Sequence, residues 1–64
     1  MNDKIYSIFE YDKNDKCTNH ALGTPIQLLD NYYTEHDYYY IIIGDNNKLT
    51  AKQLINKLKE LKNE

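Results

Sequence analysis

The chain has 64 residues, and its 8 lysines without any arginine against 10 acidic residues give a formal charge of −2 at pH 7. A chain of this length forms one domain that buries about 60% of its unfolded surface, which excludes a two-domain enzyme, a doubly wound cofactor fold and an eight-stranded barrel. Hydrophobic residues make up 41% and charged residues 28%, a balance typical of a folded globular domain. Tyrosine supplies 7 of the 8 aromatic residues.

The cysteine content and the apolar runs indicate the compartment. Cys17 is the only cysteine, so no internal disulfide forms, as is usual in a reducing cytoplasm. The N-terminal residues lack the apolar run of a secretion signal, and the longest apolar run, residues 38–43, is too short to span a membrane. Abundant Asn, Lys and Ile without Arg are typical of AT-rich genomes, such as a low-GC bacterium or its phage. We therefore expect a cytoplasmic protein, in the host cytoplasm if phage-encoded, with no membrane partner.

The first third of the chain predicts a hairpin. Residues 4–11 are rich in β-branched and aromatic residues and predict a strand. Residues 12–15 carry Asp and Asn side chains that favour a turn, and the polar residues 16–21 predict an edge strand. Because side chains alternate along a strand, one face of residues 4–11 carries Ile5, Ser7, Phe9 and Tyr11, and the other carries Tyr6, Ile8 and Glu10.

The middle of the chain predicts a helix and a third strand. Thr24 precedes Pro25 and is followed three residues later by Gln27, which together form a capping box with proline at the first helical position. This pattern predicts a helix over residues 25–33. Residues 38–43 are six consecutive strand formers and predict the central strand, and residues 44–47 predict a turn.

The last segment predicts an amphipathic helix over residues 51–62. Thr50 caps it, Gln53 completes a second capping box, and apolar residues recur at intervals of three and four. This element also divides the charge. Residues 1–47 carry three lysines against eight carboxylates, whereas residues 48–64 carry five lysines against two.

These elements predict a single α+β domain, residues 1–64, of order β-β-α-β-α. It has two layers, a three-stranded and mostly antiparallel sheet and a C-terminal amphipathic helix. Both helices most simply cover one face of the sheet, which leaves the other face exposed. The alternative is a sandwich, in which one helix covers each face and the tyrosines become ordinary core residues.

No pattern in the sequence supports catalysis or a bound cofactor. Cys17 and His20 fall on opposite faces of a strand, so His20 does not activate the thiol. Glu35, His36 and Asp37 lack the spacing that holds zinc, and there is no glycine-rich phosphate loop. We therefore expect a non-enzymatic protein with no metal and no cofactor.

The charge distribution disfavours nucleic acid as a partner. Tyrosines on a small sheet stack bases in RNA-recognition domains, and the second helix supplies lysines. The sheet-forming half is nevertheless acidic, and neutralisation of phosphate supplies most non-specific affinity. A nucleic-acid binder that uses the lysine-rich helix remains an alternative.

The tyrosines instead predict a protein-binding surface. If Tyr39, Ile41 and Ile43 point inward, then alternate residues of the third strand form an apolar patch of the kind that a partner covers. Tyrosine is enriched at such interfaces, and flanking carboxylates favour a basic site on the partner. The partner is another protein, a second copy of the chain, or both. The predicted partner-binding residues are Tyr6, Tyr32, Tyr33, Tyr38, Tyr39 and Tyr40, with Asp12, Asp15, Glu35 and Asp37.

The order of elements also resembles a known inhibitor family. An acidic hairpin turn from Asp12 to Asp15, a glycine followed by a helix that ends in Tyr32 and Tyr33, and an apolar third strand are similar to the small phage-encoded inhibitors of uracil-DNA glycosylase. The resemblance implies a protein that pairs as a dimer and imitates DNA through an acidic surface. We therefore predict a small phage or mobile-element inhibitor or adaptor. A DNA mimic that blocks a DNA-processing enzyme is an alternative function.

Overall fold

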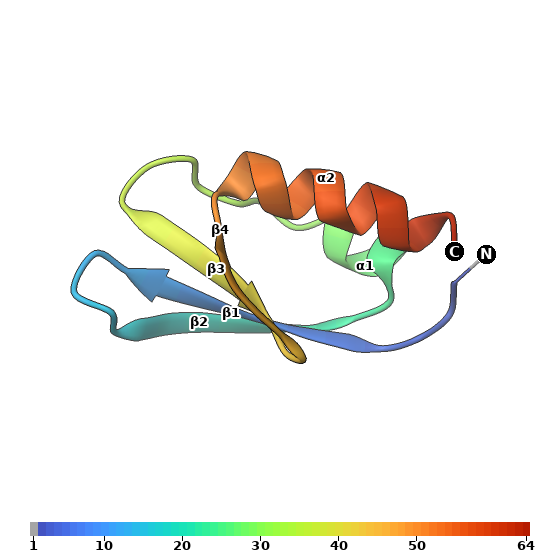
Figure 1. Ribbon diagram of the computed structural model, residues 1–64, viewed down its shortest axis with the longest axis horizontal. Coiled ribbons are helices and arrows are strands. Elements are labelled where there is room, and N and C mark those ends of the chain that lie inside the picture. The colour runs from blue at the N-terminus through green and yellow to red at the C-terminus, as the bar shows by residue number, and fades with distance from the viewer. Residues whose placement is uncertain (1) are drawn as a thin grey trace.

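The sheet is antiparallel throughout, and its strands lie in the order β2-β1-β3-β4 (Figure 1). The structure is a computed structural model that describes residues 2–64. Along the chain, the elements are β1 (Tyr6–Asp12), β2 (Cys17–Gly23), α1 (Pro25–Leu29), β3 (Tyr38–Ile42), β4 (Asp45–Leu49) and α2 (Ala51–Lys62). The α+β class and the C-terminal helix agree with the sequence prediction, and α2 has the predicted bounds.

The sheet has four strands, so the prediction of three strands and the order β-β-α-β-α is wrong. The missed strand, β4, pairs with β3 through Tyr40 opposite Leu49 and Ile42 opposite Asp45. Ile43 and Gly44 form the tight connection, and Gly44 adopts a φ of 96°, which glycine adopts without steric cost. Pairing with β3 therefore makes a strand of a segment whose local sequence favours a turn. The other predicted strand ends lie within two residues of those observed.

Helix α1 ends four residues earlier than predicted. The capping box is present as expected, with Thr24 accepting from the Gln27 backbone N–H at 3.3 Å. The backbone N–H of Asp30 then donates to the Gln27 carbonyl and that of Asn31 to the Leu28 carbonyl, so the last turn tightens and ends. Asp and Asn favour such non-helical conformations, which outweighs the apolar spacing that predicted a longer helix.

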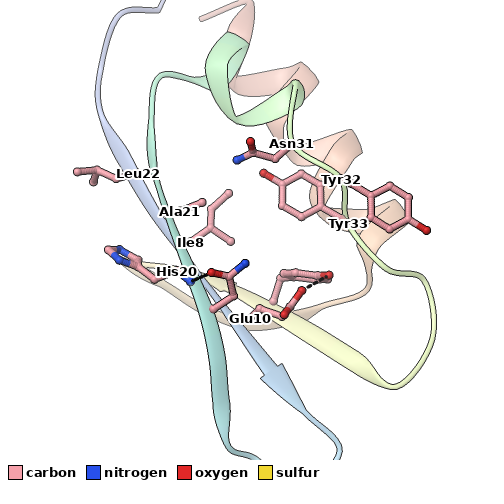
Figure 2. Close-up of a pocket in the computed structure, with 10 residues that line it drawn as sticks. Ile8, Glu10, His20, Ala21, Leu22, Asn31, Tyr32 and Tyr33 are labelled. Carbon is pink, nitrogen blue, oxygen red and sulfur yellow. Dashed lines mark hydrogen bonds between the residues drawn. The ribbon is translucent and has the colours of Figure 1, made fainter.

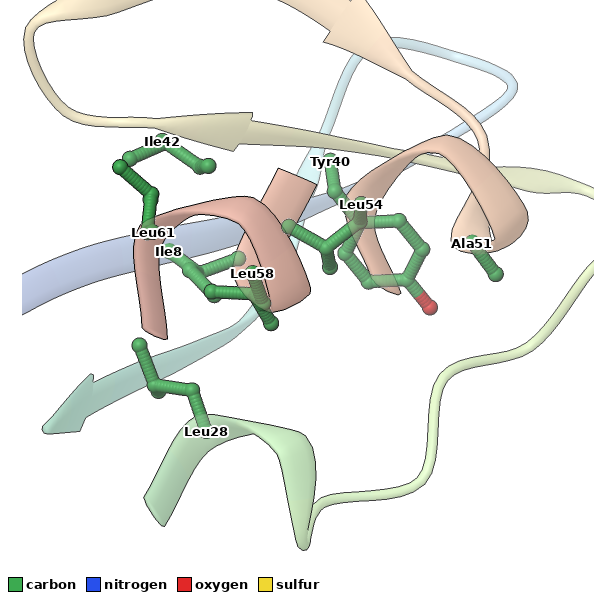
Figure 3. Close-up of a cluster of buried hydrophobic side chains, with 8 residues drawn as sticks. All are labelled: Ile8, Leu28, Tyr40, Ile42, Ala51, Leu54, Leu58 and Leu61. Atoms are coloured by element: carbon green, nitrogen blue, oxygen red, sulfur yellow. The ribbon is translucent and has the colours of Figure 1, made fainter. Parts of the chain in front are cut away.

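Both helices lie on the same face of the sheet (Figure 1). They contact each other as well as the strands, so the alternative sandwich with one helix on each face is wrong. The core lies between this face and the helices (Figure 3). Its buried side chains are Ile8, Leu28, Tyr40, Ile42, Ala51, Leu54, Leu58 and Leu61.

Of the two orientations that the sequence left open for β3, the structure has the one that points Tyr40 and Ile42 inward. Tyr40 and Ile42 are 1% and 3% exposed and pack against α2, so they form the core and not the patch. Tyr39 and Ile41 consequently point to the opposite side of the sheet. All six residues from 38 to 43 are apolar or aromatic, and no alternation marks the inward side. The pairing of β3 with β1, whose Ile8 is buried, decides it.

The two ends of the described chain lie side by side. The backbone N–H of Asn2 donates to the Lys62 carbonyl at 3.4 Å, and its side-chain amide donates to the Leu61 carbonyl at 3.1 Å. The same amide also donates to the Tyr6 hydroxyl at 3.0 Å. These bonds join the start of β1 to the last turn of α2, whose final carbonyls have no partner within the helix.

Candidate functional site

One face of the sheet carries no helix, and we call it the open sheet face. Ile8, Tyr40 and Ile42 are buried beneath the helices, so their sequence neighbours point to the opposite side. The strand registers then place these neighbours next to one another. The open sheet face consists of Ser7, Phe9, Tyr11, His20, Leu22, Tyr39, Ile41 and Ile43.

Two stacked ring pairs occupy the middle of the open sheet face. Phe9 and His20 lie opposite each other on β1 and β2, with ring centroids 4.6 Å apart and planes 14° apart. Tyr11 and Tyr39 lie opposite each other on β1 and β3, at 5.1 Å and 11°. Aromatic pairs contribute about 0.5–1.5 kcal/mol beyond the area they bury, so the strands hold these rings as a preorganised surface.

A polar corner, formed by Asp15 and Lys48, borders the ring pairs. The Tyr39 hydroxyl donates to Asp15 Oδ1 at 3.0 Å, and Lys48 Nζ lies 4.8 Å from the centroid of the Tyr39 ring. Lys48 Nζ is also 3.9 Å from Asp15 Oδ1. Partial loss of solvent, followed by the hydrogen bond to the Asp15 carboxylate, raises the pKa of Tyr39. Because Lys48 and Asp15 lie this close together, the two charges of the polar corner offset each other.

The opposite end of the open sheet face is aliphatic. Leu22 is 65% exposed and Ile43 is 58% exposed. Both lie beside Ser7 of β1, since Leu22 pairs with Ser7 and the Ile43 N–H donates to the Ser7 carbonyl at 2.9 Å. The open sheet face thus grades from aromatic and polar at one end to aliphatic at the other.

A second candidate site, the β2 cavity, lies on the helix side of the sheet beneath β2 (Figure 2). It has a volume of about 480 Å³. The strands supply one wall, and the segment after α1 supplies the other. The lining residues are Ile8, Glu10, Asn19, His20, Ala21, Leu22, Asn31, Tyr32, Tyr33 and Tyr40.

Glu10 is the centre of a hydrogen-bonded chain in the β2 cavity. Its Oε1 accepts from the Thr18 hydroxyl at 2.9 Å, and its Oε2 accepts from the Tyr40 hydroxyl at 2.9 Å. The Tyr40 oxygen in turn accepts from the Thr34 backbone N–H at 2.9 Å. Burial, followed by the hydrogen bond to Glu10, raises the pKa of Tyr40 to about 12. Tyr40 therefore stays protonated and keeps the carboxylate in place.

The structure divides the predicted partner-binding tyrosines among three places. Their sequence clustering between residues 32 and 40 does not produce one patch, because neighbours in a strand point to opposite faces. Tyr39 lies on the open sheet face, Tyr32, Tyr33 and Tyr40 line the β2 cavity, and Tyr6 and Tyr38 pack against the core from its edge.

Two of the predicted carboxylates satisfy backbone groups of the chain itself. Asp12 Oδ1 accepts from the backbone N–H groups of Asn14 and Lys16 at 2.9 and 3.0 Å and so builds the hairpin turn. Glu35 Oε2 accepts from the Lys52 N–H at 3.1 Å, at the start of α2. Asp37 adopts a left-handed φ of 68° in the loop before β3. Only Asp15 contacts a tyrosine of the open sheet face.

Four of the site residues that sequence reasoning missed are informative. Phe9 and Tyr11 share a face with Ser7 in the sequence pattern, but nothing in the pattern shows which face the helices cover. Glu10 is a carboxylate among apolar strand residues, and this is the one local signal that could have marked the β2 cavity. The position of His20 against Phe9 follows from the strand register, which the sequence does not reveal.

Comparison with protein-family models, curated proteins and solved structures finds no match to this chain. Within residues 2–64, no three His, Cys, Asp or Glu side chains gather as a metal site. Neither helix in this range has the length and apolar character of a membrane span.

Proposed function

We propose that the chain is a non-enzymatic protein-binding module of the inhibitor or adaptor kind, and that its open sheet face packs against the same face of a second copy. The observation that carries the proposal is a preorganised aromatic and aliphatic surface with no helix over it. Its ring pairs are held by cross-strand stacking, and its aliphatic end leaves Leu22 and Ile43 more than half exposed.

The chain exposes enough surface to form a dimer interface of ordinary size. Monomeric proteins rarely expose contiguous apolar patches larger than a few hundred Å². A stable interface of ordinary size takes about 800 Å² from each partner, which is under a fifth of the 4454 Å² that this chain exposes. Two sheets that pack face to face lie about 10 Å apart with interdigitating side chains, so the open sheet faces of two copies form a sandwich interior.

Charge on the open sheet face favours a copy of itself as the partner. The polar corner at its border holds one pair of opposite charges, Asp15 and Lys48, which offset each other. The side chains of the open sheet face itself carry no formal charge when His20 is neutral. A partner of opposite sign is therefore not required. Two such faces meet without the repulsion that like charges impose on an interface.

The test is the oligomeric state with a matched pair of variants. Sedimentation velocity from 1 µM to 500 µM is expected to show a monomer–dimer equilibrium for the natural chain. Leu22→Glu places a charge on the open sheet face and is expected to raise the dissociation constant at least tenfold. Ile26→Glu, which alters an exposed aliphatic side chain of α1 on the helix side, is the control and keeps the dimer. A natural chain that stays monomeric at 500 µM would overturn the proposal.

Nucleic acid binding is the outcome that would replace this proposal. Stacked rings beside Lys48 present π-faces and a cation, as single-strand-binding surfaces do. Fluorescence anisotropy with a single-stranded oligonucleotide at 50 mM and 200 mM salt separates the two functions. We expect no binding. Salt-dependent binding that Tyr39→Ala abolishes would assign the open sheet face to nucleic acid, whereas binding that Lys57→Glu on α2 abolishes would assign it to the lysine-rich helix.

A further inference from the structure

We infer that the β2 cavity binds a lysine or arginine side chain of another protein, presented by an extended segment that adds as a new strand to the free edge of β2. This site lies on the helix side of the sheet, so it is separate from the open sheet face and stays accessible when that face is covered. The inference rests on the chemistry of the cavity wall and on the backbone that borders it.

The shape of the β2 cavity suits one long side chain. Its volume of about 480 Å³ lies within the range of 300–1,000 Å³ that is typical of ligand pockets. Figure 2 shows Asn31 and Tyr33 on one side, facing Glu10 and Ile8 across the cavity, whereas the ring of Tyr32 points outward at its mouth. Tyr33 is held in place, because its hydroxyl donates to the Leu28 carbonyl at 2.6 Å. The cavity therefore has one wall fixed by the sheet and one fixed by α1.

The charge of the lining selects a cation. Glu10 is the one formally charged residue that lines the cavity at neutral pH when His20 is neutral, and no lysine lines it. Each Glu10 oxygen accepts one hydrogen bond, and a carboxylate has about four acceptor positions, so it still accepts bonds from an ammonium or a guanidinium. Tyrosine rings attract cations through their π-faces, and Tyr32, Tyr33 and Tyr40 all line the cavity. Tyr32 is 88% exposed, so no packing holds its ring away from an entering side chain.

The free edge of β2 can pair with an extended segment that carries that side chain. β2 is an outer strand of seven residues with no charged residue and no proline, which are the features that usually prevent an edge from pairing. Its Asn19–Leu22 stretch borders the cavity, and Figure 2 shows the side chains of His20 and Leu22 pointing away from the cavity tyrosines. The β2 backbone therefore forms the rim of the cavity.

The hydrogen-bond register shows which backbone groups of β2 an added strand would meet. The Ile43 N–H donates to the Ser7 carbonyl, so the backbone of Ser7 faces β3 and, by alternation, that of Ile8 faces β2. Ala21 pairs with Ile8, so its neighbours His20 and Leu22 direct their backbone groups outward. The Asn19 side chain already accepts from the His20 N–H at 2.9 Å and would be displaced by a pairing strand.

Strand geometry then carries a side chain into the cavity. In an added strand, alternate side chains project to the same face of the sheet as Ala21, which is the cavity side. One such position lies opposite Asn19, which pairs with Glu10, so a long side chain there extends past β2 toward the Glu10 carboxylate. Backbone pairing would supply affinity with little regard to sequence, and the cavity would select a cation at one position.

The first experiment tests the cavity alone with small probes. Amide chemical shifts of the 15N-labelled protein are followed during titration with n-butylguanidinium, n-butylammonium and, as the uncharged control, n-pentanol. Guanidinium or ammonium is expected to shift Glu10, Asn31 and Tyr33, and the stronger of the two identifies arginine or lysine. Equal shifts with n-pentanol would overturn the cation selectivity. Shifts confined to the open sheet face would overturn the site.

The second experiment uses short peptides to test whether an added strand pairs with β2. Blocked seven-residue peptides of alternating threonine and valine carry lysine, arginine or norleucine at the centre, and binding is measured by the same shifts. A cationic peptide is expected to bind at least tenfold more tightly than the norleucine peptide and to shift Ala21 and Leu22. Equal affinity for all three peptides, or no binding at 2 mM, would overturn the inference.

Two variants of the chain separate this inference from the proposed dimer. Glu10→Gln removes the charge but keeps an acceptor for Tyr40, and it is expected to reduce the preference for the cationic peptide at least tenfold. Tyr32→Ala changes a side chain that is almost fully exposed, so it leaves the fold intact and is expected to weaken peptide binding. Tyr39→Ala on the open sheet face is the control and leaves peptide binding unchanged. Unchanged binding in both Glu10→Gln and Tyr32→Ala would overturn the site, whatever the oligomeric state.

Discussion

Tyr39 and Tyr40 are neighbours in β3, yet the two faces of the sheet use them differently. Tyr40 lies under the helices, where its hydroxyl donates to Glu10 and accepts from the Thr34 N–H. Tyr39 lies on the open sheet face, where its ring stacks on Tyr11 and its hydroxyl donates to an exposed carboxylate. The covered face uses its aromatic residue to satisfy polar groups around a core. The open sheet face uses its own to extend a surface of stacked rings.

This difference shows that packing against the helices, and not the sequence of the strands, determines which face of the sheet becomes the core. Leu54 and Leu58 of α2 are fully buried against the covered face, and they define which alternate residues of β1 and β3 become core. The opposite set is also largely apolar, but neither helix within residues 2–64 packs on it. We therefore expect substitutions on the covered face to lower the free energy of unfolding strongly, and substitutions on the open sheet face to change it little.

The largest contrast is expected between two leucine truncations. Leu58→Ala empties a fully buried position and is expected to lower the free energy of unfolding by about 2–5 kcal/mol. Leu22→Ala, on the open sheet face, is expected to change it by less than about 0.5 kcal/mol in the monomer. Urea denaturation at 1 µM protein measures both. A loss above 2 kcal/mol for Leu22→Ala would show that the open sheet face is part of the stabilising core.

A smaller contrast is expected when each of the two neighbouring tyrosines loses its hydroxyl. Tyr40→Phe removes a donor to Glu10 and leaves the Thr34 N–H without its acceptor, so it is expected to cost about 1–2 kcal/mol. Tyr39→Phe removes one exposed hydrogen bond and keeps the stacked ring, and its expected cost is under about 0.5 kcal/mol. The same urea denaturation measures the pair. Equal losses of unfolding free energy in the two variants would contradict the difference between the faces.

The smallest effect is a pH dependence that belongs to Tyr40. Its pKa is raised from 10.0 to about 12, so above pH 10 the folded state holds a proton that the unfolded state has lost. Stability from this group is complete below pH 10 and falls as the pH rises toward 12, with a loss of about 1 kcal/mol between pH 9 and pH 11. Unfolding at those two pH values is compared in the natural chain and in Tyr40→Phe. The natural chain is expected to lose more, and equal losses would contradict the assignment.

The parts of the fold that were predictable are those with local signals. Thr50, Gln53 and the spacing of Leu54 and Leu58 specify α2 within a single segment, and its bounds were correct. β4 has no such signal, because Asp, Asn and Lys disfavour strands and only pairing with β3 makes it one. α1 ended early because residues 30 and 31 compete for the backbone, although the apolar spacing continues.

The sites were less predictable, because they depend on contacts between distant segments. The sequence favoured both helices on one face of the sheet, as the structure has them, and Tyr39 lies on the other face. It did not reveal which face that was, since every residue from 38 to 43 fits either side. Glu10 and Tyr40 meet across 30 positions of the sequence, and Asp15 reaches Tyr39 across 24. Only strand register brings such pairs together.

The bonds between Asn2 and the last turn of α2 have a consequence for how the chain is connected. Because the two ends meet on one side of the domain, away from the β1–β2 turn, a short glycine linker would join them with little loop-closure entropy (Figure 1). New ends opened at Lys13 or Asn14, both exposed in that turn, would yield a circular permutant that keeps the same core. The order of the elements along the chain is then separable from their arrangement in space.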